Sequence, residues 1–156
     1  MGELITATIY VDTSFNNGIC QAGYYIYFNF GNEPYVNCTE VFEAPDNNSA
    51  ELYGIQKACE VTMNMYKSVY NYDEEPEYHF KVFNDNITAV TVSDSGYKPS
   101  KKANGRFKHT KWIKAWCEEN NITLKCVRKK RSHVIMKKCD KLSKSYRKEG
   151  KWKHMK

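Results

Sequence analysis

Short runs of β-branched and aromatic residues alternate along the chain with longer stretches in which apolar residues recur at helical spacing. Residues 4–11 (LITATIYV) have the composition typical of a strand. Residues 22–30 and 35–42 are similar and are bounded by turns rich in Gly, Asn and Pro, which predicts an antiparallel meander of three strands. Two further strands are predicted at residues 78–83 and 122–127.

Helical spacing is clearest at residues 50–69, where apolar residues recur every three or four positions and predict a long amphipathic helix. Asn48 or Ser49 is expected to cap its start, because short polar side chains accept hydrogen bonds from the first backbone N–H groups of a helix. Further helices are predicted at residues 109–120 and from about residue 136 to residue 146.

The remaining segments are predicted to be connections, with one ambiguity. Residues 13–18 are expected to form a turn and residues 99–105 a basic loop. Residues 87–92 have the composition of a strand, but their position favours a short helix. The resulting order of elements predicts an α/β fold with a five-stranded mixed sheet, its first three strands antiparallel, flanked by helices.

Charge divides the chain into two unequal parts. The first 96 residues contain three basic and fourteen acidic residues (net −11), whereas residues 97–156 contain twenty-one basic and four acidic ones (net +17). A solvated tail accounts for the basic residues at 147–156. It accounts poorly for residues 98–114, where aromatic residues are interleaved, so a polyanion is the expected partner there. Trp112 and Trp116, four residues apart, are expected to lie in the core.

The 156 residues suit one domain, expected to span residues 1–146, with a basic tail at residues 147–156. No apolar run is long enough to cross a membrane, and the first residues lack the basic start of a signal peptide. We therefore expect a monomeric cytoplasmic protein without membrane contacts. The six cysteines lack the paired spacing of zinc sites and are expected to be small buried hydrophobic residues.

Four acidic residues lie where a solvated charge is not expected. Asp12 and Asp85 come at the ends of the first and fourth predicted strands, Glu51 lies at the start of the first helix, and Asp140 lies in the last helix. Carboxylates gathered from two strand ends and two helices form the hard-oxygen ligand set that Mg²⁺ prefers. If they converge, the chain is a metal-dependent enzyme that acts on phosphate.

The order of elements and carboxylates resembles ribonuclease H type 1, and four segments carry the resemblance over residues 5–144. Residues 10–14 (YVDTS) resemble the family's Y-x-D-G-S, and residues 47–52 (NNSAEL) its N-N-x-x-E-L. Residues 83–86 (FNDN) resemble its x-T-D-S, and Val127 with residues 139–143 (CDKLS) its closing V…A-D-x-L-A. Four motifs in this order are more specific than any one of them.

The resemblance implies an endonuclease that hydrolyses the RNA strand of RNA–DNA hybrids. Four carboxylates in this family hold two Mg²⁺ ions, for which Mn²⁺ may substitute, and the matching residues are Asp12, Glu51, Asp85 and Asp140. One ion helps to place and deprotonate the attacking water, and the other stabilises the leaving 3′ oxygen.

The resemblance also implies contacts with the hybrid. Ser14 and Asn86 match substrate-binding positions, and Asn47 and Asn48 would lie in the minor groove, where 2′-hydroxyl groups distinguish RNA from DNA. Lysines of the basic half would bind the substrate, the first three of them at phosphates of the DNA strand: Lys98, Lys101, Lys102 and Lys130.

The loop at residues 128–133 (RKKRSH) departs from the family pattern. The family usually has a catalytic histidine ten residues before the last aspartate, and that position here is Lys130. His133 is a candidate substitute as a catalytic residue, and the alternative is a surface histidine.

Each carboxylate also has an ordinary interpretation. Asp12 and Asp85 are residues common in turns, Glu51 can interact with the dipole of its helix, and Asp140 can pair with a nearby lysine. Asp94 competes with Asp85 as the third carboxylate, but choosing it would make residues 78–83 an extra strand. These interpretations together leave the match to the family order unexplained, so a common site is favoured.

Two other functions are open on the same fold. One is a non-catalytic nucleic-acid-binding module, in which Lys130 marks lost turnover. The other is a nuclease or transposase of the superfamily that acts on DNA. The presence of all four carboxylates argues against the first, and Asn47 with Asn48 argues against the second.

Overall fold

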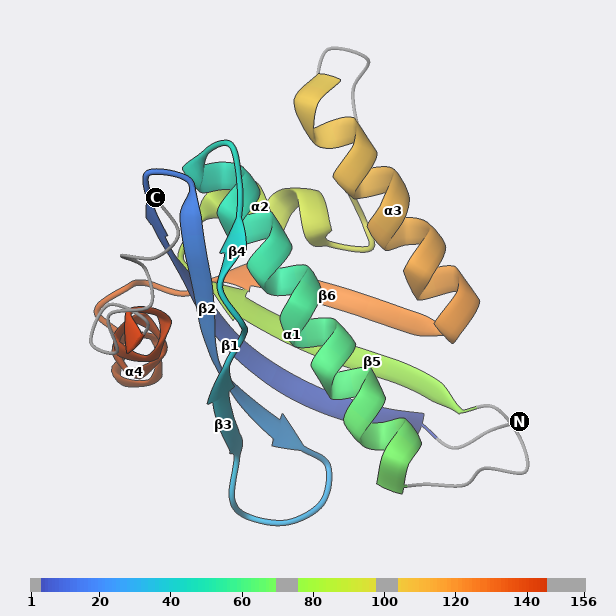
Figure 1. Ribbon diagram of the computed structural model, residues 1–156. Helices are drawn as coiled ribbons and strands as arrows, with labels where there is room; N and C mark the ends of the chain where they lie inside the picture. The colour runs from blue at the N-terminus through green and yellow to red at the C-terminus, as the bar shows by residue number, and fades with distance from the viewer. Residues whose placement is uncertain (1–3, 70–75, 98–103, 146–156) are drawn as a thin grey trace.

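The computed structural model describes residues 4–69, 76–97 and 104–145, with side chains of residues 104–110 excluded. Six strands form one mixed sheet in the order β3-β2-β1-β5-β6, with β4 paired to β2 (Figure 1). The first strands pair antiparallel, whereas β1, β5 and β6 run parallel. The strands are β1 (Leu4–Asn16), β2 (Ile19–Phe28), β3 (Tyr35–Cys38), β4 (Phe42–Glu43), β5 (Glu77–Asn84) and β6 (Ile122–Arg128).

Four helices flank this sheet, which confirms the predicted α/β fold and the antiparallel start. Three of them lie on one side, and the fourth packs against β1 and β2 from the other (Figure 1). The short helix at residues 87–92 is confirmed, because the Asn86 side chain accepts a hydrogen bond from Ala89 N and caps it. The helices are α1 (Asn47–Val69), α2 (Ile87–Ser93), α3 (Asn104–Asn120) and α4 (Val134–Ser143).

The turn predicted at residues 13–18 is wrong for most of its length. β1 continues to Asn16, because its last residues pair with the start of β2 from Asn16↔Ile19 to Thr13↔Ala22. The reversal is confined to Asn17 and Gly18, whose φ angles of 51° and 85° fit a tight hairpin. Residues 13–16, which follow Asp12, are therefore part of the sheet.

Other boundaries also shift. The third predicted strand is two short ones, β3 and β4, which makes six strands instead of five. α1 begins at Asn47, and Asp46 Oδ1 rather than the predicted Asn48 or Ser49 accepts the first-turn hydrogen bond, from Ser49 N at 2.7 Å. The predicted loop at residues 99–105 is wrong at its end, because α3 already includes Asn104 and Gly105. The predicted tail at residues 147–156 lies outside the described residues.

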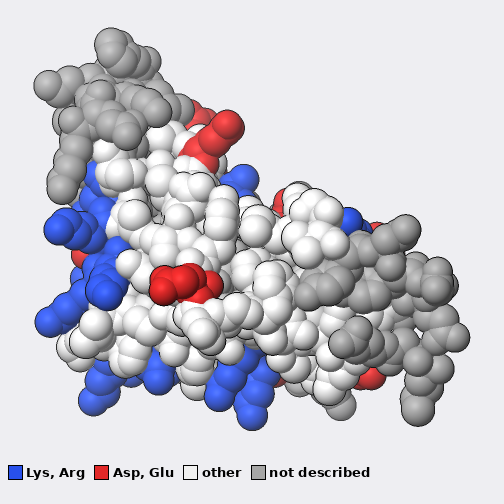
Figure 2. All heavy atoms as spheres, turned by 90° about the horizontal axis from the view of Figure 1, so that it is seen from below, with Lys and Arg blue, Asp and Glu red and all other residues white. Residues whose placement is uncertain are grey.

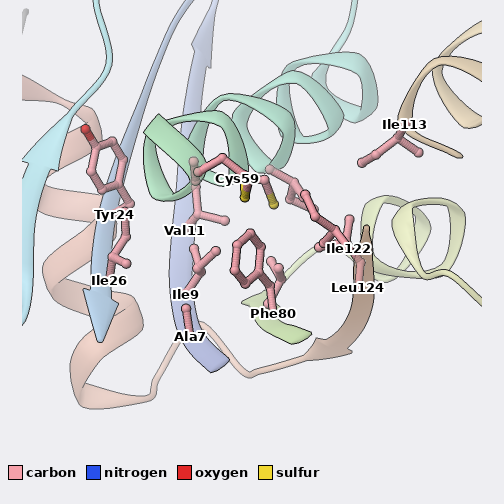
Figure 3. Packing of buried hydrophobic residues seen from close by; sticks show 14 of the residues in the cluster. Ala7, Ile9, Val11, Tyr24, Ile26, Cys59, Phe80, Ile113, Ile122 and Leu124 are labelled. Atoms are coloured by element: carbon pink, nitrogen blue, oxygen red, sulfur yellow. The ribbon is translucent and has the colours of Figure 1, made fainter. Parts of the chain in front are cut away.

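The main core lies between the sheet and helices α1 to α3 (Figure 3). Alternate residues of β1, including Ile9 and Val11, point into it together with Phe80 of β5 and Leu124 of β6. Residues of the opposite parity on β1, among them Tyr10 and Asp12, therefore belong to the other face of the sheet.

Several expectations about the core and membrane can be compared directly with the structure. All six cysteines are free thiols, four of them buried, as expected for small hydrophobic residues. Trp116 packs against the core, but Trp112 is 39% exposed, so the prediction that it is a core residue is wrong. Within the described ranges, none of the helices has the length and apolarity required to span a bilayer.

Candidate functional site

The register of the parallel strands places Asp12 beside Asp85. Tyr10 pairs with Phe83 in the last matched position of β1 and β5, and each aspartate comes two residues later on its chain. β5 ends at Asn84, whereas β1 continues, so the carboxylates meet at the carboxyl end of β5. Asp12 is only 2% exposed, and the Asp85 side chain is 15% exposed, which leaves the group open on one side.

Glu51 reaches the same place from α1, one turn after its start at Asn47. It is 3% exposed, and both of its carboxylate oxygens accept hydrogen bonds: Oε1 from Thr13 N at 2.9 Å and Oε2 from Asn84 Nδ2 at 2.6 Å. Asn84 also donates to Val11 O at 2.8 Å, so one buried amide fixes Glu51 relative to β1. These contacts orient Glu51 before any ligand binds.

Oxygen atoms of Asp12, Glu51 and Asp85 lie within 4.8 Å of one another. Three carboxylates at this separation form a hard-oxygen donor set that suits a divalent cation. The group therefore fits a divalent cation, and its members come from the positions predicted for a common site.

Asp140 approaches Asp12 from α4, on the other side of the sheet. Its carboxyl group acts on Asp12 both by its charge and by a hydrogen bond, although it lies outside the tight group of three. Close packing of α4 on β2 makes this approach possible, because Gly23 has no Cβ to meet Leu142 and Ser143. Lys144 Nζ binds Asp140 Oδ2 at 3.1 Å, so the predicted pairing with a nearby lysine also occurs.

Burial without a cation makes the carboxyl groups of Asp12 and Glu51 hard to ionise. Desolvation, reinforced by the charges of Glu51, Asp85 and Asp140, raises the pKa of Asp12 to about 9. Desolvation also raises the pKa of Glu51 to about 8, against the opposing hydrogen bonds from Asn84 and Thr13. Such grouped anions need a cation if they are to be charged together at neutral pH.

Arg131 supplies one positive charge to the group from the loop after β6. Its Nε lies 3.2 Å from Asp85 Oδ2, and the charges of Asp85, Asp12 and Asp140 raise the pKa of the guanidinium. Two hydrogen bonds hold this loop against the end of β5: Lys129 N donates to Asn84 O, and the Arg128 side chain donates through Nε to Asp85 O at 3.2 Å. The side chain of Arg131 is 74% exposed, so it can move away from the carboxylates.

The structure is similar to solved ribonuclease H1 structures. LC11 ribonuclease H1, isolated from compost, matches with a TM-score of 0.65 and 19% identity, over 93% of this chain and 95% of that one. Ribonuclease H1 from Halobacterium salinarum matches with a TM-score of 0.61 and 10% identity, over 92% and 98%. The N-terminal ribonuclease H domain of a Mycobacterium tuberculosis protein matches with a TM-score of 0.61 and 14% identity, over 90% and 92%.

The chain has the ribonuclease H fold. No protein-family model matches it, and no curated protein matches it in sequence. With identities of 10% to 19%, the structural likeness establishes the fold alone, and the chemistry must be argued from the carboxylates themselves.

The predicted substrate-binding residues of this ribonuclease H fold lie in different environments. Asn47 is exposed at the start of α1, and Asn48 Oδ1 accepts a hydrogen bond from Asn86 Nδ2 at 2.9 Å, which joins the starts of α1 and α2 beside the carboxylates. Ser14 is buried, and its hydroxyl donates to Ser143 O at 2.6 Å. This geometry favours a structural role for Ser14 over the predicted contact with substrate.

The candidate residues of the loop after β6 also lie in different environments. His133 caps α4 by accepting a hydrogen bond from Ile135 N at 3.3 Å, and its ring stacks on Tyr10 with centroids 5.7 Å apart. Lys130 is exposed in the loop. Lys98, Lys101 and Lys102 lie outside the described residues.

Two residues at the site escaped the sequence reasoning. Asn84 is part of the FNDN motif in the sequence, and a polar residue at the end of an otherwise apolar strand is the signal that could have indicated its contact with Glu51. Arg131 was one of several equivalent basic residues in its loop, and the sequence contained no signal to select it. The rejected rival Asp94 instead caps α2 and accepts a hydrogen bond from Cys126 N at 2.8 Å.

The raised pKa values predict that the metal-free protein loses stability as the pH rises. The folded protein keeps protons on Asp12 and Glu51 that the unfolded chain releases near pH 4, so folding takes up protons until the pH passes the folded pKa values of about 8 and 9. We expect the free energy of unfolding in EDTA to be about 3–5 kcal/mol lower at pH 8 than at pH 6, because each retained proton contributes up to about 1.4 kcal/mol per pH unit.

Divalent cations should act in the opposite direction, because they bind the deprotonated carboxylates. The stabilisation produced by Mg²⁺ should therefore be larger at pH 8 than at pH 6. Urea denaturation in EDTA and in Mg²⁺ at both values measures the effect. Equal stabilisation by Mg²⁺ at the two pH values would contradict this account of the group.

Proposed function

We propose that this chain is a metal-dependent endoribonuclease that hydrolyses the RNA strand of RNA–DNA hybrids. The observation that carries the proposal is the convergence of Asp12, Glu51 and Asp85 within 4.8 Å at one edge of a ribonuclease H fold. LC11 ribonuclease H1, which shares the fold at 18% identity, has been solved in complex with an RNA/DNA hybrid. Asp140, on the adjoining helix, completes the set of four carboxylates.

Two Mg²⁺ ions, for which Mn²⁺ would substitute, would be held by Asp12, Glu51, Asp85 and Asp140. Such ions supply Lewis-acid stabilisation of the charge that develops on a scissile phosphate. The chain itself fixes the ligands: Asn84 and the backbone of Thr13 orient Glu51.

Recognition of the hybrid would fall to residues around this edge. Asn47 is exposed, and the bonded pair Asn48 and Asn86 lies between the starts of two helices, which suits contacts with sugar and base edges in a minor groove. Lys130 would contact phosphate from the loop after β6. His133 caps α4 through Nδ1 alone, so a catalytic role would fall to its other ring nitrogen, Nε2.

The proposal is tested with end-labelled RNA–DNA hybrid, duplex DNA and duplex RNA of one sequence, each incubated with Mg²⁺ and with Mn²⁺. We expect cleavage at internal positions of the RNA strand of the hybrid only, and none in EDTA. Failure to cut the hybrid with either metal would overturn the proposal. Cleavage of duplex DNA instead would assign the chain to a DNA-directed nuclease.

Replacement of Arg131 by Gln should tighten metal binding. The guanidinium occupies Asp85 Oδ2 and carries a charge of the same sign as the metal, so a cation must displace it or be repelled by it. An exposed ion pair of this kind is worth up to about 1 kcal/mol, which corresponds to a roughly fivefold lower dissociation constant for Mn²⁺ in calorimetry. Lys130→Gln, in the same loop, is the control and should leave the constant within about twofold.

A further inference from the structure

The face of the sheet opposite α1 is only partly covered. α4 packs over β1 and β2, and no described element covers β5 and β6 on this side. His79, Lys81, Thr123 and Lys125 are accordingly exposed in the middle of the two strands, while their sequence neighbours are buried in the core. Antiparallel and mixed sheets can leave one face in water. On this face, however, lysines and aromatic rings lie together.

Like charges face each other across the two strands. Lys81 is the registered partner of Lys125, and Thr8 lies on the other side of Lys81, so two ammonium groups occupy adjacent positions of one row. Like charges placed directly opposite destabilise a sheet. Among the residues that the structure describes, neither lysine forms an ion pair with a carboxylate. A polyanion would relieve this repulsion.

Aromatic rings form the next row of the same face. Tyr10 stacks on Phe83 with centroids 4.9 Å apart, and it meets Tyr27 edge to face at 6.0 Å. Tyr10 is also the registered partner of Tyr25. Lysine ammonium groups lie over these rings: Lys81 at 5.2 Å and Lys129 at 4.6 Å from the centroid of Phe83, and Lys138 at 5.9 Å from that of Tyr25.

The side chains that make up this surface, called here the lysine–aromatic face, share one side of β1, β2, β5 and β6 and the adjoining loop and helix. They are Tyr10, Tyr25, Tyr27, Lys81, Phe83, Lys125, Lys129 and Lys138. In the view from below, Lys and Arg side chains gather at the left and along the lower edge of the molecule (Figure 2).

We propose that the lysine–aromatic face binds single-stranded nucleic acid. Unpaired bases can stack on the partly exposed rings of Tyr25 and Tyr27, whereas the Tyr10 ring is already stacked against Phe83 and His133. Lysines would neutralise the phosphates, as on sheet surfaces that hold single strands without reading their sequence. Duplexes keep their bases stacked inside, so they would gain only the charge contacts. The row that contains the two lysines runs from Tyr27 on β2 to Lys125 on β6 and spans three strand spacings, about 14 Å. This length matches about four nucleotides, if successive charges of one strand are about 3.4 Å apart.

The face leads directly to the carboxylates. Tyr10 precedes Asp12 by two residues on β1, so the ring row lies on the same side of β1 as this aspartate, and Asp85 comes two residues after Phe83, just beyond the end of β5. A single strand held here would run toward the candidate metal group. The binding itself requires no hydrolysis and no metal, so it stands or falls separately from the proposed nuclease.

The test is fluorescence anisotropy of a labelled twelve-nucleotide oligo(dT) in EDTA, with the double variant Lys81→Glu/Lys125→Glu. We expect the affinity to fall by at least about tenfold, and the slope of log K against log salt to fall by about 1.4, since each lost phosphate contact on a single strand accounts for about 0.7. Lys57→Glu/Lys67→Glu on α1, on the opposite side of the sheet, changes the net charge equally and should alter the affinity less than about twofold.

A ring variant separates stacking from charge. Tyr27→Leu keeps an apolar side chain and should lower the affinity for oligo(dT) about tenfold, with little change in the salt slope. Circular dichroism of each variant checks that the fold is kept. The proposal would be overturned if the two double lysine variants lost the same affinity for oligo(dT). It would also be overturned if Tyr27→Leu weakened the binding of a duplex of the same length as much as that of oligo(dT). A wild-type protein that does not bind the oligonucleotide would likewise overturn it.

Discussion

Replacement of Asp12 by Asn is expected to abolish cleavage of an RNA–DNA hybrid while making the metal-free protein more stable at pH 8. Asp12 is the carboxylate on which Glu51, Asp85 and Asp140 all act, so its loss removes the centre of the proposed metal group. The rate should fall by at least about 10³-fold, which corresponds to about 4 kcal/mol of lost transition-state stabilisation. Single-turnover cleavage in Mg²⁺ measures it, and binding of the hybrid should persist.

The gain in stability follows from the same burial. At 2% exposure the charged form of Asp12 is costly without a cation, and the neutral amide removes that cost. Urea denaturation in EDTA at pH 8 should give a higher free energy of unfolding for Asp12→Asn than for the wild type. Loss of both activity and stability would point instead to a structural role for this carboxylate.

Asp94→Asn is the matched control, because Asp94 was the rival third carboxylate. Its two oxygens accept hydrogen bonds from Cys126 N at 2.8 Å and from Gly96 N at 2.9 Å, so an amide would leave one backbone donor without its acceptor. We expect cleavage to persist and the free energy of unfolding to fall by about 1–2 kcal/mol. If Asp12→Asn loses activity and gains stability while Asp94→Asn does the reverse, Asp12 is a metal ligand and Asp94 a structural residue.

The sequence predicted the strands and helices well where periodicity was long, as in α1 and β5. It failed at the end of β1, because the polar run after Asp12 has the composition of a turn while its conformation is set by pairing with β2. The division of β3 from β4 likewise follows from two separate pairings with β2. Local propensity contains no information about such pairing.

For the site, the sequence pointed to acidic residues at two strand ends and in two helices, and the structure brings three of them, Asp12, Glu51 and Asp85, within 4.8 Å of one another. The sequence could not place Ser14, whose hydroxyl is used by Ser143 O, a residue 129 positions away. It also could not choose among the basic residues of the loop, since the choice of Arg131 follows from how Lys129 and Arg128 are tied to the end of β5. A sequence motif does not show the role of a side chain when that role depends on a contact with a residue far away in the sequence.

Replacement of Gly23 by Ala should both destabilise the protein and weaken catalysis, because it acts on the distance between α4 and the sheet. A Cβ at this position would collide with the carbonyl oxygen of Cys139 and lie 2.6 Å from Leu142 Cβ and 2.8 Å from Ser143 N. Two of these three atoms belong to the backbone, so α4 as a whole must move outward. We expect the free energy of unfolding to fall by about 2–3 kcal/mol.

The same movement withdraws Asp140 from Asp12, since both Cys139 and Asp140 lie on the displaced turn. A misplacement of about 1 Å in a catalytic group can cost about 10²-fold in rate, so cleavage of the hybrid should fall by that order even at temperatures where the variant is fully folded. Gly31→Ala is the control: with φ at 76° and no atom within 4 Å of the new Cβ, it introduces backbone strain without touching α4. That variant should lose about 1 kcal/mol of stability and keep its activity. Full activity in a destabilised Gly23→Ala protein would mean that Asp140 does not take part in the reaction, and the metal group would then consist of Asp12, Glu51 and Asp85 alone.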